Sequence, residues 1–376
     1  MELILATFLR RINRFVVEVE IEGKPCQAYL PNPGRLWELL LPGRLLYLTP
    51  QRDKNYPYLL LAAIKKGKPV LLHTHLTNSL IKKLLLKKAL PMFSEYELIK
   101  EEPKIGRSRF DFLLVHSKNE EKLFLEVKTC TLFGERLALF PDAETERGTR
   151  HLLELAQLTK EGNRGACLFV VMNPNVEYFL PAYHIDFAFT EVFLKTFSWV
   201  NYWAIAIELD PTFSEIKAFR SLKIPVGILH RENLNSGIYL LVMYLENSHN
   251  IAIGSALNPH FDRGYYIYVG SAKNNLRQRI RRHKHKRKTK HWHIDYFLER
   301  AKLLTTIPIV SRESLECSFA KALSQIAERS IKGFGASDCL CPSHLFYFSH
   351  NPLLLEPFIE LLNYYRLEKP LQTWAL

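Results

Sequence analysis

Three charged residues interrupt two apolar segments that have the composition of β-strands. Asp111 lies in RFDFLLV (109–115), and Glu126 and Lys128 lie in KLFLEVKT (122–129). Side chains two residues apart share one face of a strand, and Asp111 reaches that face if the segments pair as a hairpin. Two converging carboxylates suit a hard divalent ion, and a neighbouring lysine can polarise the water that attacks a phosphodiester. On this interpretation Asp111 and Glu126 would bind Mg²⁺ (or Mn²⁺), and Lys128 would be catalytic. The alternative is a salt-bridged edge strand.

Two further segments carry polar residues that could contact nucleic acid. FPDAETERGTRHLLEL (140–155) contains Arg147 and His151, which we expect to contact phosphate, although its acidic residues also suit the N-terminus of a helix. PNPGR (31–35) contains Asn32 and Arg35, which we expect on a DNA-binding face. A tight turn built by Pro and Gly is the alternative for this segment.

A second set of polar residues lies in the C-terminal part of the chain. Tyr239 and Tyr268 lie in two strand-like segments, Arg279 follows in a helix-like segment, and Glu316 lies in a later one. A tyrosine that handles a proton, an arginine that neutralises phosphate and a carboxylate that holds one metal ion could together cleave a phosphodiester. On this interpretation Tyr239, Tyr268 and Arg279 would be catalytic, and Glu316 would bind metal. Arg277 is an alternative to Arg279, and ordinary packing is the alternative for the tyrosine pair.

The segment from 273 to 290 holds ten Lys/Arg and no acidic residue. Such a run is often a solvated face, but here it directly follows the YVGS of the second tyrosine segment, which favours contact with phosphate. The residues expected to bind nucleic acid are His283, Lys284, Lys286 and Arg287.

Six cysteines are scattered along the chain, which is untypical of a disulfide framework and favours a reducing compartment. Cys339-X-Cys341 with His344, and His291-X-His293, raise the question of zinc. Their spacing falls short of the paired ligand sets of zinc sites. We therefore expect structural cysteines and histidines that pack or face DNA.

Alternating and helical patterns indicate the elements that position these residues. Five strand-like segments between 14 and 74 predict a small barrel of the oligonucleotide-binding (OB) type. SLIKKLLLKKAL (79–90) and ETERGTRHLLELAQLTKEG (144–162) predict helices, and ACLFVVMNP (166–174) predicts a buried central strand. A polar stretch with Pro and Gly near residue 226 predicts a boundary, so we expect domains at 1–83, 84–226 and 227–376.

Composition and charge narrow the class of protein. The 376 residues are 47% hydrophobic, no apolar run reaches the ~20 residues that span a bilayer, and the start lacks the order of a signal peptide. We expect a soluble, cytoplasmic protein with no membrane partner. Residues 1–88 carry 15 Lys/Arg against 6 Asp/Glu, and residues 227–376 carry 20 against 12. These basic flanks predict a nucleic-acid partner, DNA first. Oligomeric state and small-molecule ligands stay open.

The order of acid, hairpin and acid-X-Lys resembles the PD-(D/E)XK nuclease core. The first 226 residues also resemble the sugar fermentation stimulation protein A family. The segments that carry this resemblance are PNPGR (31–35), RSRFDFLL (107–114), FLEVKTCTL (124–132), FPDAETERGTRHLLEL (140–155) and PAYHID (181–186). It implies an OB-like barrel, a PD-(D/E)XK-type domain, DNA binding and nuclease activity, with Asp111 and Glu126 as metal ligands and Lys128 as the catalytic lysine.

The segment from 227 to about 350 resembles the GIY-YIG nuclease family through GIY (237–239) and YVG (268–270). This resemblance implies the same catalytic roles for Tyr239, Tyr268 and Arg279 and a metal-binding role for Glu316. The 28 residues between the tyrosines exceed the usual short hairpin and predict an inserted strand or loop.

The expected fold class is α/β multidomain, with an N-terminal OB-like β-barrel, a PD-(D/E)XK restriction-endonuclease-like mixed α/β domain and a C-terminal GIY-YIG-like α/β domain. The leading function is a DNA-binding protein with metal-dependent nuclease activity on DNA or RNA. The alternative is a non-catalytic DNA-binding regulator of sugar metabolism genes with degenerate nuclease folds. An RNA-processing or repair scaffold is a third class, because OB-like barrels bind single strands of either kind.

Overall fold

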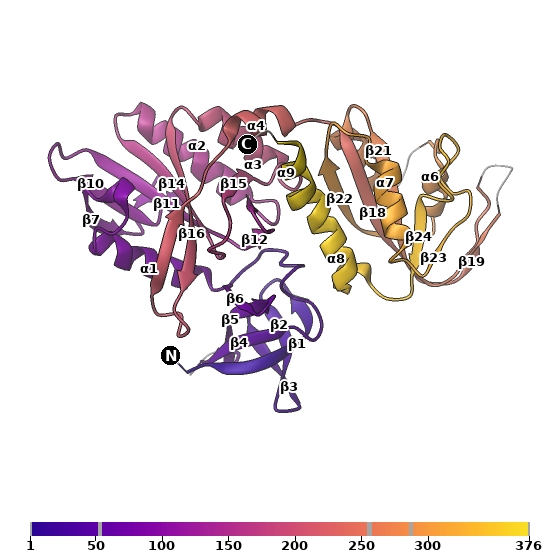
Figure 1. Cartoon of the computed structure of the whole chain (residues 1–376), viewed down its shortest axis with the longest axis horizontal. Helices are drawn as coiled ribbons and strands as arrows, with labels where there is room; N and C mark the ends of the chain where they lie inside the picture. The colour runs from indigo at the N-terminus through magenta and orange to yellow at the C-terminus, as the bar shows by residue number, and fades with distance from the viewer. Residues whose placement is uncertain (1, 52–54, 254–257, 286–288, 375–376) are drawn as a thin grey trace. The chain divides into compact units, whose positions relative to one another are not determined.

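The computed structural model describes residues 2–51, 55–253, 258–285 and 289–374 (Figure 1). The chain forms two compact units. One comprises Met1–Leu229 together with Pro370–Leu376, and the other comprises His230–Lys369.

The first unit begins with a closed five-stranded barrel. Its strands run in the order β3-β2-β1-β4-β5, parallel pairing of β3 with β5 closes it, and β6 extends β5. The strands are β1 (Ile4–Asn13), β2 (Val16–Ile21), β3 (Lys24–Tyr29), β4 (Leu45–Pro50), β5 (Tyr58–Lys65) and β6 (Lys68–Leu71). Alternate residues such as Val17, Val19 and Leu46 are fully buried, as the pleat of a strand requires. The predicted OB-like barrel is confirmed, but β1 was not foreseen, because Arg10 and Arg11 interrupt its apolar pattern.

A six-stranded sheet forms the centre of the mixed α/β part of this unit. Its order is β17-β16-β14-β11-β10-β7, with parallel strands β11, β14 and β16 in the middle. The strands are β7 (Tyr96–Glu101), β10 (Phe112–His116), β11 (Lys122–Cys130), β14 (Arg164–Val171), β16 (Val200–Leu209) and β17 (Ile216–Ser221). β10 and β11 form the predicted antiparallel hairpin. β14 is the predicted central strand, buried from Gly165 to Val171.

Helices and small strands complete this unit. They are α1 (Thr74–Leu86), a short 3₁₀ turn (Pro91–Phe93), β8 (Lys104–Ile105), β9 (Ser108–Arg109), β12 (Leu132–Phe133), β13 (Leu137–Phe140), α2 (Glu146–Lys160), β15 (Tyr178–Pro181) and α3 (Phe187–Thr196). α1 packs on β7 and β11, whereas α2 packs on β14 and β16. The helix α2 begins after Thr145, whose hydroxyl accepts the Gly148 N–H. It buries Leu152, Leu155 and Leu158, as its helical spacing predicts.

The second unit is built on an antiparallel sheet in the order β22-β18-β21-β24-β23. Its strands are β18 (Gly237–Leu245), β21 (Gly264–Ala272), β22 (Lys302–Val310), β23 (Arg329–Ser330) and β24 (Leu345–Phe348). The long connection between β18 and β21 contains a second ladder, β19 (His249–Asn250) with β20 (His260–Phe261), so the predicted insertion is confirmed. The helices are α5 (Leu276–Lys284), α6 (His293–Phe297), α7 (Glu316–Ser324) and α8 (Glu356–Asn363), and a 3₁₀ turn (Pro352–Leu354) precedes α8.

Two helices fall at the joins between the units in the sequence, α4 (Val226–Glu232) and α9 (Lys369–Thr373), the latter after a π-helical turn (Tyr364–Glu368). Among the described residues, every helix is too short or too polar to cross a membrane.

Candidate functional sites

Asp111 immediately precedes β10 and is fixed by the hairpin. Its N–H donates to the Leu125 carbonyl at 3.1 Å, and its Oδ2 accepts the Val127 N–H at 2.6 Å. Asn78 of α1 donates from Nδ2 to Oδ1 at 2.6 Å. The Asp111 carboxyl group is therefore held against β11, the strand that carries Glu126.

Glu126 lies in the middle of β11, and its side chain is only 4% exposed. Its Oε1 lies 2.6 Å from Nδ1 of His151 and also accepts a hydrogen bond from the Lys128 ammonium group. Its Oε2 is buried and accepts no hydrogen bond from any residue that the structure describes. A buried carboxylate oxygen without a donor is costly, because nothing replaces its hydration.

The charges of this group oppose and stabilise one another. Burial and then the charge of Glu126 raise the pKa of Asp111 to about 7. Burial also works against the charge of Glu126, but Lys128 and His151 outweigh it and hold the pKa of Glu126 below its usual value. Burial acts in the same way on Lys128, whose pKa is nevertheless raised, chiefly by Glu126.

The donor set of this group fits a hard divalent cation. Oxygen ligands from two carboxylates are the kind that Mg²⁺ uses, and the unbonded Oε2 of Glu126 offers a lone pair for one. Burial is the main cause of the raised pKa of Asp111, and a cation there would relieve the second cause, the charge of Glu126. Asp111 and Glu126 would hold the ion, and Lys128 lies beside them.

The other predicted residues of the first unit lie in two places. Arg147 lies next to the group around Glu126, because its Nε is 3.4 Å from Nε2 of His151. His151 is 1% exposed and contacts Glu126, so the structure places it inside the group and not on the surface. Contact of either residue with phosphate stays a prediction.

Asn32 and Arg35 lie in a loop that packs against Asp142. Asn32 Oδ1 accepts the Gly34 N–H at 3.0 Å, and its Nδ2 donates to the Leu72 carbonyl at 3.2 Å. Asp142 Oδ2 accepts the Leu36 N–H at 3.1 Å. A Cβ on Gly34 would lie only 2.3 Å from the same oxygen, so the loop and Asp142 are in close contact. Arg35 stacks over Trp37. These contacts are those of the tight-turn alternative, and a role in DNA binding stays a prediction.

In the second unit, the paired tyrosines lie on neighbouring strands. β18 and β21 pair Tyr239 with Gly270, and the rings of Tyr239 and Tyr268 lie 6.4 Å apart. A Cβ on Gly270 would lie 2.6 Å from the Tyr239 hydroxyl, so only glycine admits this packing. The Tyr239 hydroxyl lies 3.0 Å from Nε2 of His283 on α5. Burial raises the pKa of both tyrosines above the ordinary value.

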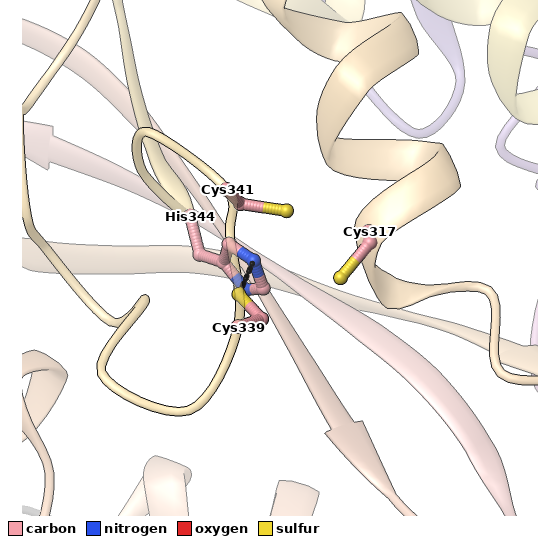
Figure 2. A group of neighbouring side chains, drawn as sticks. All are labelled: Cys317, Cys339, Cys341 and His344. Atoms are coloured by element: carbon pink, nitrogen blue, oxygen red, sulfur yellow. Dashed lines mark hydrogen bonds between the residues drawn. The ribbon is translucent and has the colours of Figure 1, made fainter.

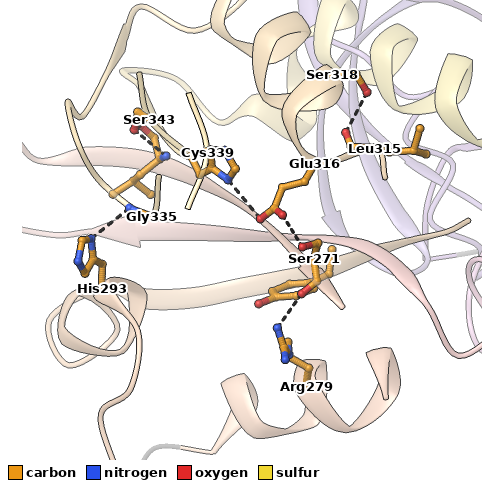
Figure 3. A network of polar contacts seen from close by, with 12 residues as sticks. Ser271, Arg279, His293, Leu315, Glu316, Ser318, Gly335, Cys339 and Ser343 are labelled. Atoms are coloured by element: carbon orange, nitrogen blue, oxygen red, sulfur yellow. Dashed lines mark hydrogen bonds and ion pairs between the residues drawn. The ribbon is translucent and has the colours of Figure 1, made fainter. Parts of the chain in front are cut away.

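Glu316 begins α7 and lies beside β21 (Figure 3). Its Oε2 accepts a hydrogen bond from the Ser271 hydroxyl, and its Oε1 lies 3.2 Å from Nδ1 of His344. Arg279 of α5 donates to the Ser271 carbonyl at 2.8 Å, which places it at the same strand end. Burial opposes the charge of Glu316, but the bonds from His344 and Ser271 outweigh it, so its pKa is lowered. The catalytic role of Arg279, with Arg277 as its alternative, stays a prediction.

The basic segment is described only in part. His283 is 3% exposed and contacts Tyr239, so it lies within the tyrosine group and not on the surface. Lys284 is exposed at the end of α5. Lys286 and Arg287 lie outside the described residues. Binding of nucleic acid by these four stays a prediction.

Three contacts were missed by sequence reasoning: that of Asn78 with Asp111, and those of Ser271 and His344 with Glu316. Asn78 is separated from Asp111 by 33 positions, and His344 from Glu316 by 28. Asn78 has no local motif, and the patterns that contain Ser271 and His344 do not indicate a contact with Glu316, so only the folded chain reveals these partners.

The first unit combines a β-barrel with a mixed α/β sheet, and the second unit is built on an antiparallel sheet with helices. Comparison with known proteins agrees with this division. The family model "SfsA N-terminal OB domain" matches residues 9–72 and "Sugar fermentation stimulation protein RE domain" matches 75–213. "Domain of unknown function DUF123" matches 238–366.

Relatives named "Sugar fermentation stimulation protein homolog" match this chain, among them those of two organisms. That of Pyrococcus furiosus is 39% identical over 174 residues, which are 46% of this chain and 75% of the relative. That of Desulforamulus reducens is 35% identical over 221 residues, covering 58% and 91%. A solved structure, "The structure of Pyrococcus Furiosus SfsA in complex with Ca2+", matches with a TM-score of 0.55 and 33% identity, over 59% of this chain and 96% of that one. The chain belongs to the sugar fermentation stimulation protein family.

Proposed function

We propose that this chain is a DNA-binding, metal-dependent nuclease whose principal site is formed by Asp111, Glu126 and Lys128. One observation carries the proposal: Lys128 donates to Glu126, whose other carboxylate oxygen is buried and accepts no hydrogen bond from the described residues, while the Asp111 carboxyl group bonds to Val127, the next residue of that strand. A bound Mg²⁺ or Mn²⁺ would supply a water of lowered pKa and neutralise charge on the phosphate.

The chain's own residues have separable roles in this proposal. Asp111 and Glu126 hold the ion, and the hydrogen bonds from Asn78 and His151 orient their carboxylates. Lys128 keeps its proton at Nζ next to Glu126, where its ammonium group can orient an attacking water by a hydrogen bond or neutralise the charge of a phosphate oxygen. The Ca²⁺ named for the Pyrococcus furiosus structure supports this class of ion, because Ca²⁺ and Mg²⁺ both prefer oxygen ligands.

We infer a second phosphodiester site of the GIY-YIG type in the C-terminal unit. Its support is the gathering of Tyr239, Tyr268, Arg279 and Glu316 at one end of β21. In this reading a tyrosine hydroxyl moves the proton, Arg279 faces phosphate charge and Glu316 binds a second ion.

The test is cleavage of labelled single- and double-stranded DNA and RNA by the full chain with Mg²⁺ or Mn²⁺. Lys128→Ala should reduce cleavage at the first site at least ~100-fold, because a charge-stabilising group is lost. Lys122→Ala removes an exposed lysine of the same strand and is the matched control. Arg279→Ala tests the second site against Arg281→Ala, an exposed arginine of the same helix.

The outcomes separate the two functions. Cleavage that is lost in Lys128→Ala but kept in Lys122→Ala supports the first site. Binding without cleavage on every substrate would instead identify a non-catalytic DNA-binding regulator. Cleavage unaffected by Arg279→Ala would remove the second site from the proposal.

A further inference from the structure

Three cysteines and one histidine gather in the second unit, next to Glu316 at the start of α7. Cys317 lies in the first turn of α7, Cys339 and Cys341 lie in the loop before β24, and His344 immediately precedes that strand (Figure 2). One ligand atom from each of the four residues lies within 4.8 Å of every other. Figure 2 shows these side chains approaching from the helix on one side and the loop on the other.

The distances suit a tetrahedral ion. Bonds of ~2.3 Å to sulfur and ~2.0 Å to nitrogen imply ligand separations of roughly 3.5–3.8 Å. Cys339 Sγ lies 3.4 Å from Nε2 of His344, already at this separation, and shifts of about 1 Å would bring the others to it. All six cysteines of the chain are free, so no disulfide explains the gathering.

His344 is oriented as a metal ligand. Its Nδ1 lies 3.2 Å from Oε1 of Glu316, and its Nε2 points to Cys339. A carboxylate that holds one ring nitrogen fixes the tautomer and leaves the other nitrogen's lone pair for a metal. The ring is 1% exposed, so its direction is set by packing.

We propose that Cys317, Cys339, Cys341 and His344 bind one zinc ion. Three thiolates and an imidazole are soft and borderline ligands that select Zn²⁺ over Mg²⁺ or Ca²⁺, and four protein ligands make a closed, structural site. His291 and His293 are outside it, because His293 Nδ1 accepts the Gly335 N–H and His291 packs by Trp292.

The site joins two segments that border the tyrosine group. Zinc would fasten the loop of Cys339 to α7, which carries Glu316. Gly335, just ahead of that loop, lies so close to Tyr268 that a Cβ there would be 2.9 Å from its ring. The zinc assignment itself does not depend on nuclease activity.

The first experiment measures metal content in the full chain purified under reducing conditions, by elemental mass spectrometry. We expect about one zinc ion per chain and no comparable amount of iron. Cys317→Ala should lose most of it, to roughly a tenth of an equivalent or less, because a closed site loses one of four ligands. Cys26→Ala is the control, since Cys26 is a half-exposed cysteine in the barrel.

The second experiment uses the unaltered chain, so it stands even if Cys317→Ala fails to fold. With zinc bound, N-ethylmaleimide should label Cys26 while Cys317, Cys339 and Cys341 are protected at least ~10-fold. Removal of the metal by a chelator should expose all three. Equal labelling with and without zinc, iron in place of zinc, or a disulfide among the three cysteines would each overturn the proposal.

Discussion

At the scale of single residues, the group around Glu126 and the group around Glu316 share one arrangement. In each, a carboxylate that is largely removed from water is held by a histidine: His151 on Glu126 and His344 on Glu316. Such partners orient a carboxylate and keep it charged despite burial. Each histidine is therefore part of the arrangement that holds its carboxylate.

The His151 contact predicts a measurable loss of metal affinity. His151→Ala should weaken Mn²⁺ binding at the first site ~10- to 100-fold, because Glu126 loses the group that orients it. Isothermal titration of the full chain with Mn²⁺ measures this. His116→Ala removes a histidine of β10 that contacts Glu95 instead and should leave the affinity unchanged. An equal loss in both variants would contradict the prediction.

At the scale of elements, close strand packing and helix entry position the C-terminal group. Gly270 lets the tyrosine rings lie against the backbone of β21, and Asp295 fixes the turn that leads into α6. Both features are local, so each predicts a defined cost when it is altered.

Gly270→Ala should destabilise the chain by about 1–3 kcal/mol, because a Cβ would displace both tyrosine rings from a packed position. Urea unfolding of the full chain measures the change in free energy. Gly227→Ala is the matched control: its Cβ would meet nothing within 4 Å, it lies in α4, and alanine favours helix. If Gly270→Ala unfolds like Gly227→Ala, the packing argument is wrong.

Asp295 predicts a pH-dependent contribution to stability. It accepts two hydrogen bonds from Arg282, at 2.9 and 2.8 Å, and the N–H groups of His291 and Trp292. Burial opposes its charge, but these bonds outweigh it and hold its pKa well below the ordinary 3.8. A lowered carboxyl pKa stabilises the fold above the ordinary value and ceases to do so as the pH falls through the folded-state pKa.

Asp295→Asn should therefore lower the free energy of unfolding by about 2–3 kcal/mol at pH 7. The gap to the unaltered chain should narrow as the pH falls below about 4. Urea unfolding at pH 7, 5 and below 4 measures it, with Glu246→Gln, an exposed carboxyl of the same unit, as the control. A gap independent of pH would point to packing and not charge.

At the scale of the whole molecule, charge is distributed between the ends. The first 88 residues carry a net charge of +9 and the last 150 a net charge of +8, while the middle carries −4, which gives +13 for the chain. Binding of a polyanion to such a chain releases counterions and is therefore sensitive to salt.

The affinity for labelled duplex DNA should fall at least ~1,000-fold between 50 and 200 mM salt if six or more phosphates are neutralised. Fluorescence anisotropy measures it. Lys284→Ala should reduce the slope of log affinity against log salt by about one, because one phosphate contact is lost. Lys118→Ala, which removes an exposed lysine of the acidic middle, should leave the slope unchanged. Affinity that ignores salt would contradict the electrostatic part of the proposal.

The sequence by itself determined the barrel, the β10–β11 hairpin, the buried strand β14 and the helix α2, because each follows from local periodicity and turn residues. The same periodicity placed Glu126 and Lys128 on one face. It failed for β1, where two arginines break the pattern and pairing with β2 and β4 supplies the order instead.

Only the tertiary structure decided which distant residues meet. Asn78 reaches Asp111, and Cys317 reaches the Cys339 loop, across gaps of more than 20 residues. The spacing of Cys339, Cys341 and His344 in the sequence did not predict zinc, because the fourth ligand of the proposed site, Cys317, lies on a separate helix. Contacts of this kind arise from the packing of whole elements, and no pattern in neighbouring residues encodes them.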